Sequence, residues 1–498
     1  MKTEPTMIII GAGIAGLSTG IYARMNGFDT QIYEMGSLPG GLCTSWSRKG
    51  YTFDGCIQWL VGTNPASSSH VPWQEVRALE GKTIYDPEEY LRVEVDGQCL
   101  IVYTDVDRFE KAMIDLAPED LKPVKELTAG IRSLASMDLP LDTPGDPLAG
   151  VKSATSFLPA APVWFKWGKV TMKDFVARLK SPFLRRALPL VAGEDFPIVG
   201  LMFMLSWMTN RNAGYPIGGS LEFAKTIEQR YLALGGKIEY HARVEKILVE
   251  NDTAAGIRLS DGSEHRAAWV VSAADGHATI FDMLDGKYLN DTIRGYYDTF
   301  PIFQPIVQVS LGINRDMSHA PASVSFPLEQ PINVSGTERT RLGYKIYHFD
   351  PTLAPAGKTV LQVLFDSNYA YWKAIAGDTE RYESEKKAIA VQVIDRLEKR
   401  FPGIAGQIEV VDVATPLTTE RYTGNWQGSI EGWMVTEKTM KMAFGKGMDK
   451  TLPGLKHFYM AGQWVEPGGG LPTAVMSGRK LVKQLCQKAR KPFITTTQ

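Results

Sequence analysis

Three glycines near the start of the chain, Gly11, Gly13 and Gly16, have the spacing with which a backbone turn binds a pyrophosphate. Gly11 permits a tight turn, Gly13 lets the backbone approach the phosphates, and Gly16 lets a helix pack closely on the preceding strand. Glu34 follows at a distance suited to accepting hydrogen bonds from a ribose diol. The residues predicted to contact the dinucleotide at this turn are Gly11, Gly13, Ile14, Ala15 and Gly16.

The elements that must position this turn are recognisable on both sides of it. Residues 7–10 are an apolar run typical of a buried parallel strand, and residues 17–25 carry apolar side chains at helical spacing. Gly27 closes the predicted helix, and residues 30–33 form a second predicted strand that ends at Glu34. A complete strand–helix–strand unit places the phosphates at a helix N-terminus, where backbone N–H groups favour negative charge.

A second glycine pair distinguishes between the dinucleotides NAD and FAD. Gly40, Gly41 and Leu42 follow Pro39 shortly after the acid, and this arrangement is similar to the flavoprotein pattern in which another turn approaches FAD. An ordinary Pro-Gly turn with a purely structural role is the alternative interpretation.

Later segments extend the similarity over nearly the whole chain. They are 216–220 before a predicted helix at 221–234, a predicted strand at 237–240, residues 242–247, a predicted strand at 254–259, residues 269–275 and residues 457–473. Together with the N-terminal motifs, these segments resemble the phytoene desaturase-like branch of the FAD-dependent amine oxidase superfamily. That branch includes carotenoid desaturases, carotenoid isomerases and retinol saturases.

The resemblance implies an α/β fold with a Rossmann-like FAD-binding domain of the glutathione reductase type. It also implies an inserted α+β substrate domain with an antiparallel sheet. Val244 matches the residue whose backbone holds the adenine, and the closing glycine motif before the last helix matches the segment that meets the flavin and ribityl chain. The further cofactor-binding residues implied are Gly40, Gly41, Leu42, Val244, Gly462, Gly468, Gly469, Gly470 and Leu471. Gln463 and Gln58 depart from the pattern of many relatives, which leaves the subtype open.

The order of the segments predicts a discontinuous organisation. We expect the FAD-binding domain to comprise residues 1–75, 215–290 and 445–498, and the substrate domain to comprise 76–214 and 291–444. Alternating residues around Asp96-Gly97 predict a hairpin within 90–103. Antiparallel strands are predicted at 304–312, 343–349 and 358–366, and a charged amphipathic helix is predicted at 379–400.

Composition excludes several classes of protein. The 54 basic residues nearly balance the 55 acidic ones, so no global field favours nucleic acid. Four scattered cysteines without a C-x-x-C pair argue against a zinc ribbon and a disulfide framework, and no motif indicates a metal. We find no signal peptide and no apolar run of the ~20 residues that span a bilayer, and we expect a cytoplasmic protein.

The neutral total hides one basic and aromatic stretch at 157–186, which contains seven Lys or Arg residues and a single acid, Asp174. Such a stretch suits a membrane interface, and we expect a membrane-facing helical part within 157–208 and a peripheral location on the inner face of the membrane. The equally weighted alternative is a helix packed on the substrate domain with a solvated basic face.

The predicted function is that of an FAD-dependent oxidoreductase acting on C–C bonds of a long apolar isoprenoid or polyene substrate, by desaturation, saturation or flavin-dependent isomerisation. The alternatives are a flavin amine oxidase with a smaller substrate and a non-catalytic lipid-binding protein of the same fold, as in the Rab GDP-dissociation inhibitors. The electron partner is open between oxygen, a quinone and a nicotinamide. No catalytic residue is assigned.

Overall fold

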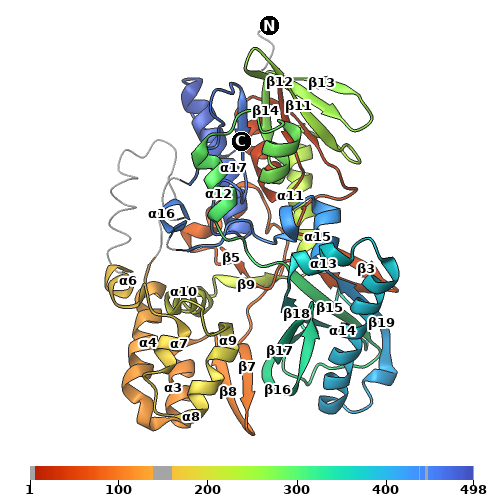
Figure 1. The fold of residues 1–498 in the computed structure, drawn as a ribbon. Coiled ribbons are helices and arrows are strands. Elements are labelled where there is room, and N and C mark those ends of the chain that lie inside the picture. The colour runs from red at the N-terminus through yellow and green to blue at the C-terminus, as the bar shows by residue number, and fades with distance from the viewer. Residues whose placement is uncertain (1–5, 138–159, 437, 444–446, 497–498) are drawn as a thin grey trace.

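The computed structural model describes residues 6–137, 160–436, 438–443 and 447–496 (Figure 1). Residues 157–159 of the basic aromatic stretch therefore lie outside the described part of the chain. Among the described residues, no helix is long and apolar enough to cross a membrane.

One part of the molecule is built around a five-stranded parallel sheet, in the order β10-β2-β1-β14-β20. Its strands come from distant parts of the chain: β1 Thr6–Ile10, β2 Asp29–Tyr33, β10 Lys237–Glu239, β14 Trp269–Ser272 and β20 Phe458–Met460. The predicted strands at 7–10 and 30–33 correspond to β1 and β2.

Both faces of this sheet are covered, which explains why residues 7–10 of β1 are all apolar. Met7 and Ile9 pack into a core with three helices, whereas Ile8 and Ile10 face a core built around a three-stranded antiparallel sheet. The helices are α1 Ile14–Met25, α11 Gly219–Ala233 and α17 Leu471–Lys488, and the small sheet consists of β11 Val244–Glu250, β12 Thr253–Leu259 and β13 Glu264–Arg266.

A second part of the molecule is built around a seven-stranded sheet, in the order β19-β15-β18-β17-β16-β7-β8. It is antiparallel except where β16 and β7 pair in parallel. The strands are β7 Glu89–Val95, β8 Gln98–Tyr103, β15 Ile306–Ile313, β16 Ser323–Val334, β17 Thr337–Ile346, β18 Thr359–Asp366 and β19 Ile408–Ala414. Helix α14, Thr379–Arg400, packs on this sheet through Ile389, Val393 and Leu397 and has the bounds that the sequence predicted.

A group of helices beside β7 and β8 forms a third core, at the lower left of Figure 1. The helices are α3 Val106–Leu116, α4 Leu121–Ala135, α6 Ala161–Trp167, α7 Met172–Val176, α8 Pro182–Ala187, α9 Pro189–Ala192 and α10 Ile198–Thr209. A capping box of Thr171 and Asp174 begins α7, and Met172, Phe175 and Leu179 are buried in this core. In 171–186 the apolar side chains therefore pack inward, as the alternative interpretation of that stretch expected.

A buried hub around Asp54 joins the two sheets. Asp54 ends β4, Tyr51–Asp54, and its carboxylate accepts hydrogen bonds from Tyr215 and from the backbone N–H and hydroxyl of Ser220. Its carbonyl oxygen accepts hydrogen bonds from the amides of Gln308 and Gln362, on β15 and β18. Two short sheets surround this hub, β3 Ser45–Arg48 with β4, and β9 Ala213–Pro216 with β5 Leu60–Val61 and β6 Ile84–Tyr85.

Candidate functional site

A cavity of about 1230 Å³ opens at the carboxyl ends of the parallel strands. In such sheets this edge is where ligands bind. All but one of the residues predicted to contact the cofactor line it, namely Gly11, Gly13, Ile14, Ala15, Glu34, Gly40, Gly41, Leu42, Val244, Gly462, Gly468, Gly469, Gly470 and Leu471.

Gly16 lies behind the wall of the cavity, where α1 approaches the strand. A Cβ atom at Gly16 would lie 1.9 Å from the carbonyl oxygen of Gly11. Its lack of a side chain is therefore required for packing, and it supports the turn without lining the cavity.

Two glycine turns meet at the start of α1. Gly13 is the N-cap of the helix, and Gly40 forms a bridge with Gly13 and donates its N–H to the carbonyl of Ala12 at 2.9 Å. Gly40 has φ +106°, and a Cβ there would lie 2.2 Å from the carbonyl oxygen of Cys43. Only glycine fits this position, and the adjacent helix N-terminus offers a favourable site for an anion.

Glu34 is held with its carboxylate at the cavity wall. Its Oε2 accepts the N–H of Ala12 and its Oε1 accepts the N–H of Gly36, each at 2.7 Å. The carbonyl of Glu34 accepts the N–H of Ala242, two residues before Val244, at 2.8 Å. This network connects the first glycine turn to the start of β11.

The closing segment brings a second helix N-terminus to the cavity. Gly470 is the N-cap of α17, and the N–H of Gly462 donates to Ser477 Oγ on the same helix at 2.8 Å. Ser477 also accepts from Lys450, whose ammonium forms a buried ion pair with Glu466 at 2.6 Å. Burial lowers the pKa of Lys450, an effect that Glu466 opposes.

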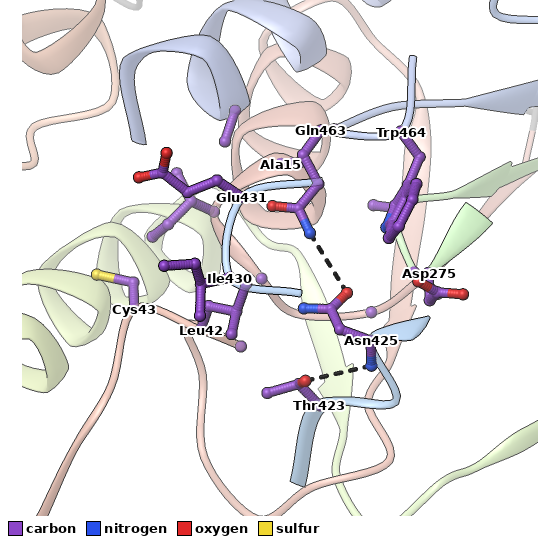
Figure 2. A pocket seen from close by; sticks show the side chains of 18 of the residues that line it. Ala15, Leu42, Cys43, Asp275, Thr423, Asn425, Ile430, Glu431, Gln463 and Trp464 are labelled. Atoms are coloured by element: carbon purple, nitrogen blue, oxygen red, sulfur yellow. Dashed lines mark hydrogen bonds between the residues drawn. The ribbon is translucent and has the colours of Figure 1, made fainter. Parts of the chain in front are cut away.

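The opposite wall comes from residues 417–435, which the sequence did not identify as part of the site (Figure 2). Asp275, just after β14, joins this wall to the parallel sheet, because its carboxylate accepts the N–H groups of Ala278 at 2.8 Å and Trp426 at 2.9 Å. Burial raises the pKa of Asp275 to about 6, although these hydrogen bonds favour the charged form.

Three tryptophans pack where the two walls meet. The rings of Trp433 and Trp464 lie 5.0 Å apart, edge to face, and those of Trp426 and Trp464 lie 6.1 Å apart. The indole N–H of Trp433 donates to the carbonyl of Trp464, whereas the buried Nε1 of Trp464 has no partner among the described residues. The concentration of tryptophan at 426 and 433 is the signal by which the sequence could have indicated this wall.

The far end of the cavity is apolar and aromatic. Trp59 and Trp207 line it with ring centroids 6.1 Å apart, beside Ile57, Leu60 and Val61. Trp207 belongs to α10, so this helix contributes to the cavity.

Three features of the wall fit a bound FAD. The N-termini of α1 and α17 both face the cavity, and neither carries an acidic side chain in its first turn. Gly40 and Gly16 leave room that any Cβ would fill. The unpartnered Nε1 of Trp464 supplies a buried hydrogen-bond donor. Within the described ranges, no group of three His, Cys, Asp or Glu residues could hold a metal ion.

Comparisons with known proteins agree with this geometry. The chain is 24% identical to prolycopene isomerase 2, chloroplastic, from an Oncidium hybrid cultivar, over 95% of this chain and 82% of that protein. It is 24% identical to a neurosporene-forming phytoene desaturase from Rhodobacter capsulatus, over 97% of this chain and 94% of that one. The solved structure of an oxidoreductase from Methanosarcina mazei matches with a TM-score of 0.60 and 19% identity, covering 96% of this chain and 100% of that chain.

Two family models match the chain. Residues 9–71 match an NAD(P)-binding Rossmann-like domain, and residues 173–486 match the flavin containing amine oxidoreductases. The second match covers more than half of the chain and includes the closing glycine segment. The chain therefore belongs to the flavin containing amine oxidoreductase family and is an FAD-dependent oxidoreductase.

Proposed function

We propose that this enzyme desaturates, saturates or isomerises C–C bonds of a long apolar polyene. The observation that carries the proposal is the continuity of the cavity from the glycine turns to the aromatic end at Trp59 and Trp207. Its volume of about 1230 Å³ exceeds the ~300–1000 Å³ typical of a single-ligand pocket, which leaves room for a second molecule beside a dinucleotide. The names of the relatives, a prolycopene isomerase and a phytoene desaturase, support the same substrate class.

The proposal assigns FAD binding to the glycine turns, Glu34, Val244 and the closing segment. When bound, FAD supplies the hydride acceptor or donor at its isoalloxazine ring. With FAD bound, the N-terminus of α17 would stabilise negative charge on that ring, and the tryptophans would keep water from the reacting carbons. In this proposal the FAD-binding domain comprises 1–75, 215–290 and 445–498, and the remaining residues form the substrate domain.

Anaerobic absorption spectra of the FAD-bound protein test this proposal. We expect a polyene, added as carotenoid or retinoid, to reduce the flavin or to be isomerised by the chemically reduced protein. Reduction by an amine and by no polyene would overturn the proposal. Reoxidation of the reduced protein by oxygen, a quinone or NAD(P)⁺ in separate mixing experiments then identifies the electron partner. Purified protein that fails to take up FAD would favour the lipid-binding alternative.

A smaller amine substrate is the second candidate. Trp426 and Trp464 both line the cavity, and an aromatic pair beside a flavin can bind an ammonium group through cation–π attraction. Their rings are inclined at 60°, so they do not form two parallel walls around a small substrate. The amine arm of the spectral experiment decides between the two candidates.

A peripheral membrane contact at α6 is part of the proposal. Phe165 is 92% exposed, and Lys166 and Lys169 are close to it in the sequence. Behind it, a row of neighbouring rings leads from the helix surface to the cavity: Trp164, Phe203, Trp207 and Trp59, with centroid separations of 6.1, 5.7 and 6.1 Å. An apolar substrate stored in a bilayer could enter along this row.

Flotation with anionic liposomes tests the membrane contact. We expect the unmodified protein to float, and we expect both Phe165→Ser and a variant with Lys166, Lys169 and Lys173 neutralised to float less. Leu232→Ser, which changes an exposed leucine on α11, is the matched control. A wild-type protein that stays with the unbound fraction would exclude the contact.

A further inference from the structure

Glu431 places a carboxyl group against the closing glycine segment. A Cβ atom at Gly469 would lie 2.5 Å from the Cβ of Glu431 and 2.8 Å from its Oε2, so the two residues are in direct contact. Gly469 immediately precedes Gly470, the N-cap of α17. Figure 2 shows Glu431 beside Ile430 and Leu42 in the cavity wall. The carboxyl group therefore lies where the closing segment meets the cavity.

The backbone around Glu431 is fixed by several hydrogen bonds. The N–H of Gly432 donates to Ser429 Oγ at 3.1 Å, and its carbonyl accepts the N–H of Phe303 at 2.9 Å. The N–H of Gly468 donates to the carbonyl of Trp433 at 3.1 Å. These bonds tie residues 429–433 to the closing segment, so the position of the Glu431 side chain does not depend on a freely moving loop.

Glu431 and Asp282 are the acids of the cavity whose carboxyl groups have no hydrogen-bond or ion-pair partner among the described residues, and Asp282 is exposed whereas Glu431 is only partly exposed. Glu34 and Asp275 each accept two backbone N–H groups, and Glu420 accepts the hydroxyl of Tyr369. On the closing segment, Glu466 is neutralised by lysines. The Glu431 side chain is partly exposed at the cavity, so its carboxyl group is available to a bound molecule.

No charged side chain fixes the protonation state of Glu431, which therefore depends on what enters the cavity. Burial alone raises its pKa to about 7, and no charged side chain contributes. The other ionisable side chains that line the cavity are Tyr33, Glu34, Cys43, Cys56, Arg243, Asp275, His277, Asp282, Glu420, Arg421 and Tyr422. A carboxyl group of this kind exists in both forms near neutral pH, which suits a general acid or base.

We propose that Glu431 is the catalytic acid–base residue of this site, which exchanges a proton with the substrate carbon next to the one that exchanges a hydride. This inference rests on the proposed polyene function. In desaturation one C–H bond breaks with its electron pair, and the hydride goes to FAD, the two-electron oxidant. The neighbouring C–H bond releases its proton to the Glu431 carboxylate, and its electron pair forms the new C=C bond. Saturation reverses both transfers, and isomerisation needs a proton added and then removed.

The first experiment requires no substrate. The absorption spectrum of the FAD-bound protein is recorded from about pH 5 to 9 for the wild type, Glu431→Gln and Glu431→Asp. A carboxyl group that ionises beside the flavin shifts the spectrum, so we expect a transition with a midpoint near 7 in the wild type. It is expected to be absent in Glu431→Gln and displaced in Glu431→Asp. An unchanged transition in Glu431→Gln would overturn the assignment.

The second experiment measures the rate of flavin reduction by a polyene under anaerobic conditions. We expect Glu431→Gln to slow this step by about 10²–10⁴-fold with its FAD content unchanged, and Glu431→Asp to recover part of the rate. Glu383→Gln, which alters an exposed acid on α14 that pairs with Lys386, is the matched control and is expected to react normally. A normal rate in Glu431→Gln overturns the role of Glu431, whereas a wild-type protein that reacts with no polyene overturns the proposed function instead.

Discussion

One wall of the cavity is formed mostly by main-chain atoms and the other mostly by side chains. On the parallel-sheet side, the wall is mostly main chain, formed by glycine turns and by the N-termini of α1 and α17. On the other side, residues 417–435 and α10 contribute large side chains such as Trp426 and Trp207. A main-chain wall suits a constant cofactor because it needs glycine at fixed positions, whereas a side-chain wall can vary with the substrate.

The strongest test of this contrast is a single methyl group added behind the main-chain wall. In Gly16→Ala the new Cβ would lie 1.9 Å from the Gly11 carbonyl, so the glycine turn must move. We expect loss of FAD binding and a decrease of more than about 4 kcal/mol in the free energy of unfolding. Flavin absorbance per chain and the Tm measure both effects.

The matched control is Gly295→Ala in α12, Asp291–Thr299, where no atom lies within 4 Å of the new Cβ. It should bind FAD normally and gain about 0.5–1 kcal/mol, because alanine favours a helix over glycine. If both variants bind FAD and unfold alike, the close contact between Gly16 and the Gly11 carbonyl is not required for the glycine turn.

The buried ion pair of Arg479 and Glu75 holds α17 behind the main-chain wall. Breaking it is expected to give the next largest loss in the free energy of unfolding. Arg479 on α17 donates to both oxygens of Glu75 at 2.8 and 3.0 Å, and Tyr22 on α1 donates to the same carboxylate at 2.6 Å. Arg479→Leu leaves a buried carboxylate with one partner fewer, so we expect a loss of about 3–5 kcal/mol in chemical unfolding. Lys225→Leu, which removes the exposed pair with Glu222, should cost less than about 0.5 kcal/mol.

Asp275 lies at the seam between the walls and makes stability depend on pH. Its pKa in the folded chain, about 6, is above the ordinary value of 3.8, so between these values the folded chain retains a proton that the unfolded chain has lost. Stability therefore falls as pH rises through this interval, by up to about 3 kcal/mol, and stays lower above it. In Asp275→Asn we expect this part of the pH dependence of Tm to disappear. Parallel profiles for the two proteins would contradict that expectation.

The apolar end of the side-chain wall should respond to substitution in substrate binding alone. Trp207→Ala removes one ring of the apolar end, and we expect the KM for a polyene to rise about tenfold, equivalent to about 1.4 kcal/mol of lost contact, with the FAD content unchanged. Leu232→Ala on the outer surface of α11 should change neither quantity. A loss of FAD in Trp207→Ala would show that the side-chain wall also contributes to cofactor binding.

Local patterns predicted much of the fold. The apolar strand, the glycine turn and the helix at the N-terminus correspond to β1 and α1, and the hairpin around Asp96-Gly97 corresponds to β7 and β8. The strands predicted at 304–312 and 358–366 match β15 and β18 within two residues, whereas the strand predicted at 343–349 covers only the last four residues of β17. These elements depend on periodicity and turn residues that lie close together in the chain.

The side-chain wall could not be predicted in the same way. Residues 417–435 were assigned to the inserted region, and nothing in their local pattern shows that Glu431 touches Gly469 or that Asp275 holds the N–H of Trp426. Likewise, the apolar residues at 172–179 left a membrane face and a packed helix as equal alternatives, and the structure packs Met172, Phe175 and Leu179 into the core beside α10. Amphipathicity identifies a face but not what covers it.

The sequence by itself determined where the main chain can approach a dinucleotide, because glycine spacing and helix starts are properties of neighbouring residues. Only the tertiary structure decided which side chains complete the cavity, which acids are left without a partner and which aromatic rings form its apolar end. Those outcomes depend on how segments separated by hundreds of residues pack together, and a local pattern carries no record of that packing.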